Sequence, residues 1–346
     1  MLLRHIVHYW PTTIDNKYIL SVAYNGWLGV DLFFVLSGFL IFFHLLEKWP
    51  KNKIKSYIKI YFIKRGLRIL PLYFFIILLI YFEMIPFYQT SLEINEQTIA
   101  NHFLFIHEYF YSPILVTLWS LATEEKFYLF APILIYLLKQ TNNLVLISIV
   151  IVFIVFISIN NFEKINLLGD ISYPQYFWGN RAPFQIAVRG LLLGGVTAIG
   201  YNKFRERVLN ERVLNYIFYS TFSLILMIFL YMPYLEFGLF MLADIMILLF
   251  SLACCMLVFC GLFLQNKITS ILSHKTLRVI AILSYALYIT HVTVIPWSIH
   301  FTNQFKLVGY PYVILLIFTY LTISFLFSLI LHYFVEKPFL IFKSKL

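Results

Sequence analysis

The sequence predicts an all-α fold: a polytopic transmembrane helical bundle of about ten helices, the first of them truncated. Three observations predict it. The 346-residue chain is 61% hydrophobic and only 12% charged, with a mean hydropathy of +0.84, too apolar for the surface of a soluble domain. Its apolar stretches have the length of a membrane crossing, and its basic residues gather in alternate loops. We therefore expect one integral-membrane domain over residues 1–346.

The apolar stretches set the number of helices, because each can cross a hydrocarbon core of about 30 Å. The opening segment "MLLRHIVHYWP" is too short to span alone. It is either a membrane-surface piece or, as we favour, the end of a first helix over residues 1–10. The stretches after it cover roughly 26–46, 69–85, 117–138, 143–159, 183–200, 213–231, 239–264, 279–298 and 311–335.

The distribution of Lys and Arg between loops predicts the orientation, since cytoplasmic loops hold them in excess. One side carries Lys17, Lys164, Arg181 and Lys306. The other side carries Lys48, Lys51, Lys53, Lys55, Lys59, Lys64, Arg65, Arg68, Lys139, Lys203, Arg205, Arg207, Arg212, Lys267, Lys275, Arg278, Lys337, Lys343 and Lys345. A cytoplasmic loop over 47–68 and a cytoplasmic C-terminus follow. The net charge of +10 then reflects topology and attraction to anionic membrane lipid, with no nucleic-acid signal.

Polar residues inside apolar stretches are informative, because an ionisable group in a bilayer usually faces a cavity or a partner. In the first stretch, Asp31 and Ser37 precede Gly38, a residue that lets another backbone or a ligand come close. Asp31 either lines a passage or pairs with a lysine or arginine. Ser37 either faces that passage or bonds to its own helix.

The segment "WSLATEEKFYLFAP" places Glu124 and Glu125 beside Lys126. Adjacent residues on a helix point about 100° apart, so the two glutamates cannot share a face. Glu124 is expected to face a passage in the outer half of the membrane, whereas Glu125 and Lys126 are expected to pair with neighbours or to snorkel. The polar stripe to which Glu124 belongs consists of Thr117, Ser120, Glu124 and Tyr128.

The segment "KRGLRILP", residues 64–71, holds Arg65 and Arg68 three positions apart, so both project from one side of a helix. Paired guanidinium groups suit phosphate, which they can bind through two hydrogen bonds each. The alternative is an ordinary basic anchor at the cytoplasmic surface.

Three histidines are further candidates. "LSYALYITHV" places Ser284, Tyr288 and His291 on one helical face, and a histidine there either transfers protons or is a hydrogen-bonded core residue. His5 and His8 lie near the outer surface, where each alone would be an interfacial aromatic residue.

A close-packing motif occurs in "IAVRGLLLGG". Gly190 and Gly194 are four residues apart, the spacing that lets two membrane helices approach closely. Arg189 beside them is expected to be a buried cation. We interpret the glycines as structural.

Five segments, in this order, resemble the acyltransferase 3 family of integral-membrane enzymes: "GVDLFFVLSGFLI" (29–41), "KRGLRILPLY" (64–73), "WSLATEEKFYL" (119–129), "SYALYITH" (284–291) and "VEKPF" (335–339). They span nearly the whole chain. The resemblance implies a bacterial inner-membrane, multi-pass protein that modifies polysaccharide of the cell envelope.

The resemblance also implies roles for individual residues. His5 matches the essential histidine that ends the first helix, with His8 as the second candidate; the arginine that begins that helix would fall before Met1, so either the true start lies upstream or the chain is impaired. Arg65 and Arg68 match the paired arginines of the family's cytoplasmic loop, which we expect to hold the phosphates of the donor, and Glu124 matches the glutamate of the Trp-Ser-Leu motif.

The implied reaction moves an acyl group, most often acetyl, from cytoplasmic acyl-CoA to a hydroxyl of an extracytoplasmic carbohydrate. His5 would act as general base or as transient acyl carrier, and Glu124 would orient its imidazole. No metal is expected. The residues expected to line the passage are Asp31, Ser37, Tyr128, Tyr288 and His291.

A transporter or flippase for an anionic or lipid-linked sugar is the alternative, since carriers also place polar groups at mid-membrane. Discontinuous helices and an inverted repeat would favour a transporter, and the sequence shows neither clearly. Release of free CoA thiol separates the two functions.

Overall fold

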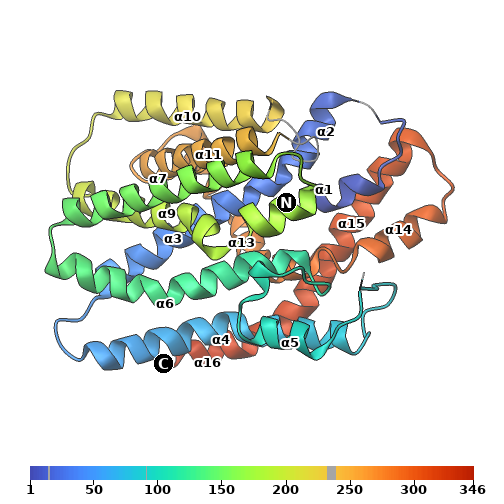
Figure 1. The fold of residues 1–346 in the computed structure, drawn as a ribbon, viewed down its shortest axis with the longest axis horizontal. Helices are drawn as coiled ribbons and strands as arrows, with labels where there is room; N and C mark the ends of the chain where they lie inside the picture. The colour runs from blue at the N-terminus through green and yellow to red at the C-terminus, as the bar shows by residue number, and fades with distance from the viewer. Residues whose placement is uncertain (15, 91, 232–238) are drawn as a thin grey trace.

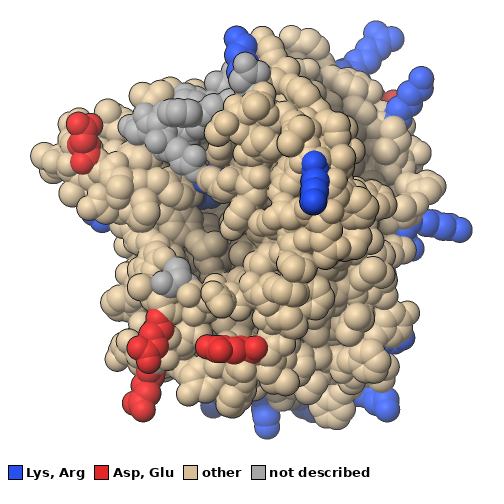
Figure 2. All heavy atoms as spheres, turned by 90° about the vertical axis from the view of Figure 1, so that its right-hand side faces the viewer, with Lys and Arg blue, Asp and Glu red and all other residues tan. Residues whose placement is uncertain are grey.

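The computed structural model describes residues 1–14, 16–90, 92–231 and 239–346, and over this part of the chain all regular structure is helical. Most of the long helices run lengthwise, and successive helices run in opposite directions (Figure 1). The turns around residues 47–53, 139–142 and 203–212 gather at one end, on the left of Figure 1, which we call the basic end. The opposite end, facing the viewer in Figure 2, is formed mostly by uncharged residues. The all-α membrane fold is confirmed.

The long helices correspond to the apolar stretches of the sequence. Among the described residues, six helical stretches are long and apolar enough to cross a membrane, and a bent helix pair makes a seventh. The long helices are α3 (Gly29–Lys48), α4 (Ile54–Tyr81), α6 (Trp119–Gln140), α7 (Asn143–Leu168), α9 (Phe184–Phe204), α10 (Glu211–Tyr231), α11 (Phe240–Gly261), α13 (Lys275–Thr290) and α15 (Gly309–Leu331). The short ones are α1 (Leu2–Ile6), α2 (Lys17–Tyr24), α5 (Glu96–Phe103), α8 (Tyr173–Tyr176), α12 (Lys267–Leu272), α14 (Ile295–Asn303) and α16 (Lys337–Ser344).

The loop expected over 47–68 is wrong, because α4 begins at Ile54 and continues through Tyr81. Only residues 49–53 connect α3 to α4. A run of lysines and arginines at a membrane surface has the same composition whether it is a loop or a solvated helical extension, so composition could not distinguish them. Arg65 and Arg68 therefore lie within a helix of 28 residues.

The single helix expected over 279–298 is also wrong. It is broken into α13 and α14, which meet at 85°. Pro296 lies in the first turn of α14, where its ring prevents the preceding residues from continuing a helix. Thr290 and Thr293 donate side-chain hydrogen bonds to the carbonyl oxygens of Ala286 and Thr290, which satisfies backbone groups at the break.

The closest helix contact joins α3 to α9, and glycine makes it possible. A Cβ atom on Gly38 would lie 2.0 Å from the carbonyl oxygen of Leu191, and one on Gly194 would lie 2.1 Å from that of Val35. Any side chain at either position would force the two backbones apart. The prediction that Gly38 lets another backbone approach, and that Gly194 serves packing, is confirmed.

Two buried ion pairs reinforce this contact. Arg181 donates to Asp31 of α3 with 2.6 Å between Nη2 and Oδ2. Arg189 of α9 binds both carboxylate oxygens of Asp244 of α11, at 3.1 and 2.7 Å. A charge in this apolar setting is stable only when it is paired, so these contacts fix α9 between α3 and α11.

Candidate active site

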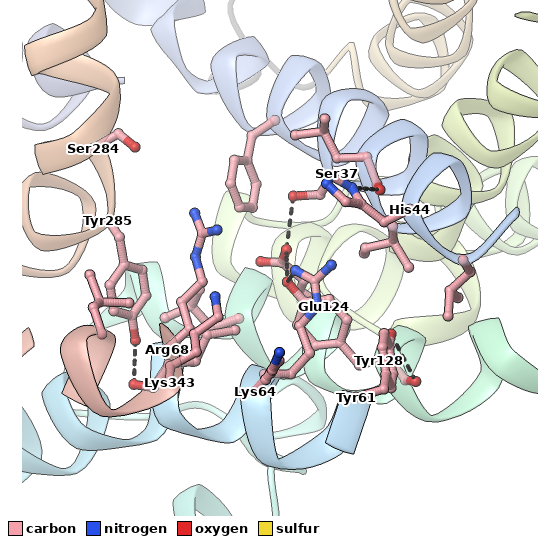
Figure 3. Close-up of a pocket in the computed structure, with 18 of the residues that line it drawn as sticks. Ser37, His44, Tyr61, Lys64, Arg68, Glu124, Tyr128, Ser284, Tyr285 and Lys343 are labelled. Carbon is pink, nitrogen blue, oxygen red and sulfur yellow. Dashed lines mark hydrogen bonds between the residues drawn. The ribbon is translucent and has the colours of Figure 1, made fainter. Parts of the chain in front are cut away.

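A cavity of about 700 Å³ lies between α3, α4, α6, α13 and α16 (Figure 3). On α3 it is lined from Gly29 to Lys48 by residues spaced three or four apart, so it follows one face of the whole helix. At 1.5 Å per residue that face is about 28 Å long, close to the thickness of a hydrocarbon core. The α3 residues of this face include Gly29, Phe33, Ser37, Leu40, His44 and Lys48.

Glu124 is the only carboxylate among the described residues that line the cavity. Its Oε1 accepts a hydrogen bond from Ser37 Oγ at 2.8 Å and a second from the Tyr128 hydroxyl at 2.6 Å. Only 4% of Glu124 is exposed, and Tyr128 lies one turn nearer the basic end of α6. Glu124 faces the cavity, which agrees with the helical face predicted for it. Ser37 and Tyr128, expected to line a passage, line the same cavity. The two hydroxyl donors fix the position of the carboxylate between α3 and α6.

Arg65 continues this chain of contacts toward the basic end. Its guanidinium lies over the Tyr128 ring, 4.7 Å from the centroid, and its Nη1 donates a long hydrogen bond of 3.4 Å to the Tyr128 hydroxyl. Arg68 also lines the cavity, one turn further along α4 and therefore further from the basic end. The structure therefore places both predicted arginines at one cavity.

Tyr288 forms the wall of the cavity toward the opposite end. Its hydroxyl donates to the Thr117 carbonyl oxygen at 3.0 Å and lies 2.5 Å from Ser120 Oγ. These bonds hold α13 against the start of α6. Ser284, one turn earlier, lines the same cavity, but its hydroxyl donates to its own helix at Ala281.

Two histidines pack behind Tyr288. The His291 ring centroid lies 5.9 Å from that of Tyr288 and 5.2 Å from that of His5. His291 Nδ1 lies 2.7 Å from the Tyr288 carbonyl oxygen, and because a carbonyl only accepts, Nδ1 carries the proton and Nε2 keeps its lone pair. The Nε2 atoms of His5 and His291 are both buried without a hydrogen-bond partner. Neither histidine lines the cavity itself; the predicted catalytic His5 and its neighbour His291 lie behind the wall that Tyr288 forms.

Four expectations about site residues need correction. Asp31 does not line the cavity, because it is held in the ion pair with Arg181; the alternative of a structural pair is the correct one. His291 lies past the end of α13 and contacts the cavity wall, not the cavity itself. Glu124 does not orient His5, since its hydrogen bonds go to Ser37 and Tyr128 and the neighbour of His5 is His291.

The fourth correction concerns Glu125. Lys126 does form an ion pair, as expected, and its partner is Glu108, a residue of the segment between α4 and α6 that the sequence did not single out. Glu125 is not paired with Lys126, and its Oε1 is buried without a hydrogen-bond partner. The second histidine candidate, His8, is exposed and lies 2.8 Å from Arg4 Nη1, so the geometry favours His5.

Several cavity residues were missed by sequence reasoning. They are cations and aromatic residues on stretches that looked like ordinary surface anchors, and nothing in a single sequence separates these from solvated side chains. The missed lining residues include His44, Lys48, Tyr57, Tyr61, Lys64 and Lys343.

The fold and the cavity define the class: an integral-membrane helical protein with polar groups along a cavity of membrane length. Residues 3–333 match the acyltransferase 3 family, described as an acyltransferase domain. The chain therefore belongs to this family.

The chain is also similar to curated proteins named as acetyltransferases. The chain is 36% identical over 147 residues to the peptidoglycan O-acetyltransferase OatA of Listeria monocytogenes. This alignment covers 38% of this chain and 23% of OatA. It is 31% identical over 172 residues to a putative acetyltransferase of Acidianus two-tailed virus, covering 46% and 48% of the two chains. It is 26% identical over 338 residues to a putative O-acetyltransferase of Staphylococcus aureus strain COL, covering 91% and 53%. The chain thus spans about half or less of the length of these relatives. No solved structure matches it.

Proposed function

We propose that the protein is a membrane-bound O-acyltransferase that moves an acyl group, most often acetyl, from acyl-CoA to a hydroxyl of an extracytoplasmic carbohydrate. Family membership supports acyl transfer, and the names of the relatives support an O-acetyl product. The observation that carries the proposal is the cavity along α3, which is lined by lysines and arginines of α3, α4 and α16 and has two histidines with unpartnered nitrogens packed behind Tyr288.

The geometry suits a reaction whose two substrates approach from opposite sides. Acyl-CoA carries phosphates that should not cross hydrocarbon, and Arg65 and Arg68 lie where they could bind them while the thioester arm extends along α3. The basic end is then cytoplasmic, as the Lys and Arg count predicts. The acceptor approaches from the opposite end, near Tyr288 and the histidines.

His5 and His291 are the candidates for the proton transfer that this reaction needs. An unprotonated Nε2 removes the proton of the attacking hydroxyl, the hydroxyl oxygen bonds to the thioester carbonyl carbon, and the carbon–sulfur bond breaks to release CoA thiolate, which regains a proton. His5 could instead carry the acyl group transiently, in two successive transfers. Ser37 and Tyr128 hold the Glu124 carboxylate in the middle of the cavity. Its negative charge would stabilise an imidazolium that forms on His5 or His291 during the reaction.

Membrane vesicles containing the protein test the proposal. With acetyl-CoA labelled in the acetyl group on the basic side, we expect label in an acceptor carbohydrate and one free CoA thiol per acetyl group transferred. Label that never leaves acetyl-CoA, with a range of polysaccharide acceptors present, would contradict it.

The transporter alternative gains one observation from the structure, the broken helix pair α13–α14. Transporters often place substrate sites at such breaks. Here the turn between the two helices holds His291 against His5. A transporter would move solute across vesicles without thiol release, so the same assay separates the two functions.

A further inference from the structure

The cations that line the cavity beside α4 come from helices far apart in the sequence. Lys64, Arg65 and Arg68 belong to α4, whereas Lys343 belongs to α16, close to the C-terminus. Figure 3 shows the Lys343 side chain in the same part of the cavity as Arg68. The sequence analysis treated Lys343 only as one of the basic anchors.

The chain brings Lys343 to this place through a turn after α15. Residues His332–Glu336 form one turn of π-helix, and Pro338 lies in the first turn of α16. Helix α16 then runs beside α4, where the C-terminus is marked in Figure 1. A cytoplasmic surface anchor would need no such packing.

The charges of this cluster are not balanced by the protein. Five lysine and arginine side chains line the cavity (Lys48, Lys64, Arg65, Arg68 and Lys343) against one carboxylate, Glu124, which is engaged by Ser37 and Tyr128. Among the described residues, Lys64, Arg68 and Lys343 form no ion pair. The nearest carboxylate on the chain before α16, that of Glu336, is bound to His332 at 2.7 Å. Like charges gathered in this way favour binding of a polyvalent anion.

The two arginines of α4 are not equivalent. The Arg65 guanidinium lies between the rings of Tyr128 and Tyr61, at 4.7 and 5.7 Å from their centroids, and bonds to the Tyr128 hydroxyl. Arg68 has no hydrogen bond or ring contact with any described residue. Its five donors are therefore available to a ligand, as are the three of Lys343. The partner of Arg68 in binding is then Lys343, and Arg65 connects this cluster to Glu124.

We propose that Lys343 of α16 is a further residue of the donor site assigned above to the arginines of α4, and that it binds the phosphate groups of a nucleotide-linked acyl donor together with Arg68. The inference rests on the proposed function, of which it specifies the donor site. Arginine binds a phosphate through two parallel hydrogen bonds and lysine as a point charge, so one residue of each kind suits a ligand with phosphates on two sides of a ribose. Lys64, on the same face of α4, adds charge without a fixed contact.

Binding of adenosine 3′,5′-bisphosphate, a nucleotide without the acyl arm, tests this directly. The protein in nanodiscs of zwitterionic lipid would be titrated by calorimetry, as wild type and as Lys343→Ala, Arg68→Ala, Lys343→Arg and Lys345→Ala. We expect the two alanine variants at the site to bind about tenfold more weakly, Lys343→Arg to retain most affinity, and exposed Lys345→Ala to match the wild type. Matching elution profiles and melting temperatures identify the variants that remain folded.

The outcomes separate this inference from the proposed function. Wild-type binding that Lys343→Ala leaves unchanged overturns the two-helix site while the donor assignment stands. No binding by the wild type removes the nucleotide donor itself, and with it both proposals. A further titration with vesicles containing phosphatidylglycerol distinguishes a lipid phosphate: if Lys343→Ala weakens only vesicle binding, the site serves lipid, and the inference is wrong.

Discussion

Ser37 of α3 and Glu124 of α6 meet inside the cavity, with 2.8 Å between the serine Oγ and the glutamate Oε1. The two residues are 87 positions apart, and each comes from a different one of the segments that carry the family resemblance. The bond orients the one carboxylate that lines the described part of the cavity. Its contribution can be measured by removing the serine hydroxyl.

Ser37→Ala removes one of the two hydroxyl donors to Glu124. We expect turnover to fall about tenfold, with a smaller change in the KM for the acyl donor, because a hydrogen bond to a charged group contributes about 1.5–3 kcal/mol. Acyl transfer in membranes measures this. Ser284→Ala is the matched control, since Ser284 lines the same cavity but bonds to its own helix. Equal losses in the two variants would mean that the bond to Glu124 has no special role.

Glu124→Gln should lower turnover more than Glu125→Gln. Glu124 lines the cavity and is held by two donors, whereas Glu125 does not line it. Loss of the charge at Glu124 is expected to cost about 10²-fold in turnover, the usual scale for a group that assists proton transfer. The reverse order would refute the assignment of the helical faces of α6.

His5→Ala should abolish transfer to the acceptor, and His8→Ala should retain most of it. The His5 ring packs on His291 and its Nε2 has no partner, whereas His8 is exposed beside Arg4. Labelled product measures the effect, and bound nucleotide confirms that the donor site is intact. Full activity in His5→Ala would leave His291 as the candidate base.

Gly194→Ala should destabilise the bundle by several kcal/mol. The new Cβ atom would lie 2.1 Å from the backbone of Val35, so α3 and α9 must separate. Thermal unfolding in detergent measures this. Gly200→Ala, on the same helix, is the control, because its Cβ would meet only Phe259 at 3.7 Å and alanine favours a helix. Equal melting temperatures for the two variants would contradict the close contact.

The segment between α4 and α6 should loosen in acid. The rings of His102 and His107 are stacked, with centroids 4.0 Å apart, and burial lowers the pKa of His102 from 6.5 to about 2 and that of His107 to about 4. Both are neutral in the folded segment, whereas the unfolded segment binds protons below about pH 6.5. Its stability is therefore complete above that pH and falls toward pH 4, by up to about 1.4 kcal/mol per pH unit for each histidine.

Limited proteolysis of the reconstituted protein at pH 7.5 and pH 5 measures this loosening. Cleavage between α4 and α6 should be faster at the lower pH, and His107→Gln should reduce the difference. His44→Gln is the control, because His44 is exposed on α3 and its ring bonds to the Leu40 carbonyl oxygen of its own helix, outside the segment. Equal cleavage rates at the two pH values would show that the histidines do not couple the segment to pH.

The sequence by itself determined the membrane class, the approximate position of most long helices, and the roles of Gly38 and Gly194 in close helix packing. These follow from local properties: length of apolar stretches, residue spacing and the absence of a side chain. It also singled out Ser37, Arg65, Arg68, Glu124, Tyr128 and Tyr288, because polar residues in apolar stretches are few. Pattern alone could not decide which of these residues share a cavity and which, like Asp31, only balance a buried charge.

The tertiary structure decided the pairings. Asp31 is neutralised by Arg181, 150 positions away, and Lys126 by Glu108. His5 lies against His291 because the helix is interrupted after α13. Lys343 lines the same cavity as Arg68 because α16 packs along α4. Each pairing depends on the packing of helices that are distant in sequence. An unpaired charge is costly in the low-dielectric interior of the bundle, so the packing of the whole bundle decides which partner a charge has.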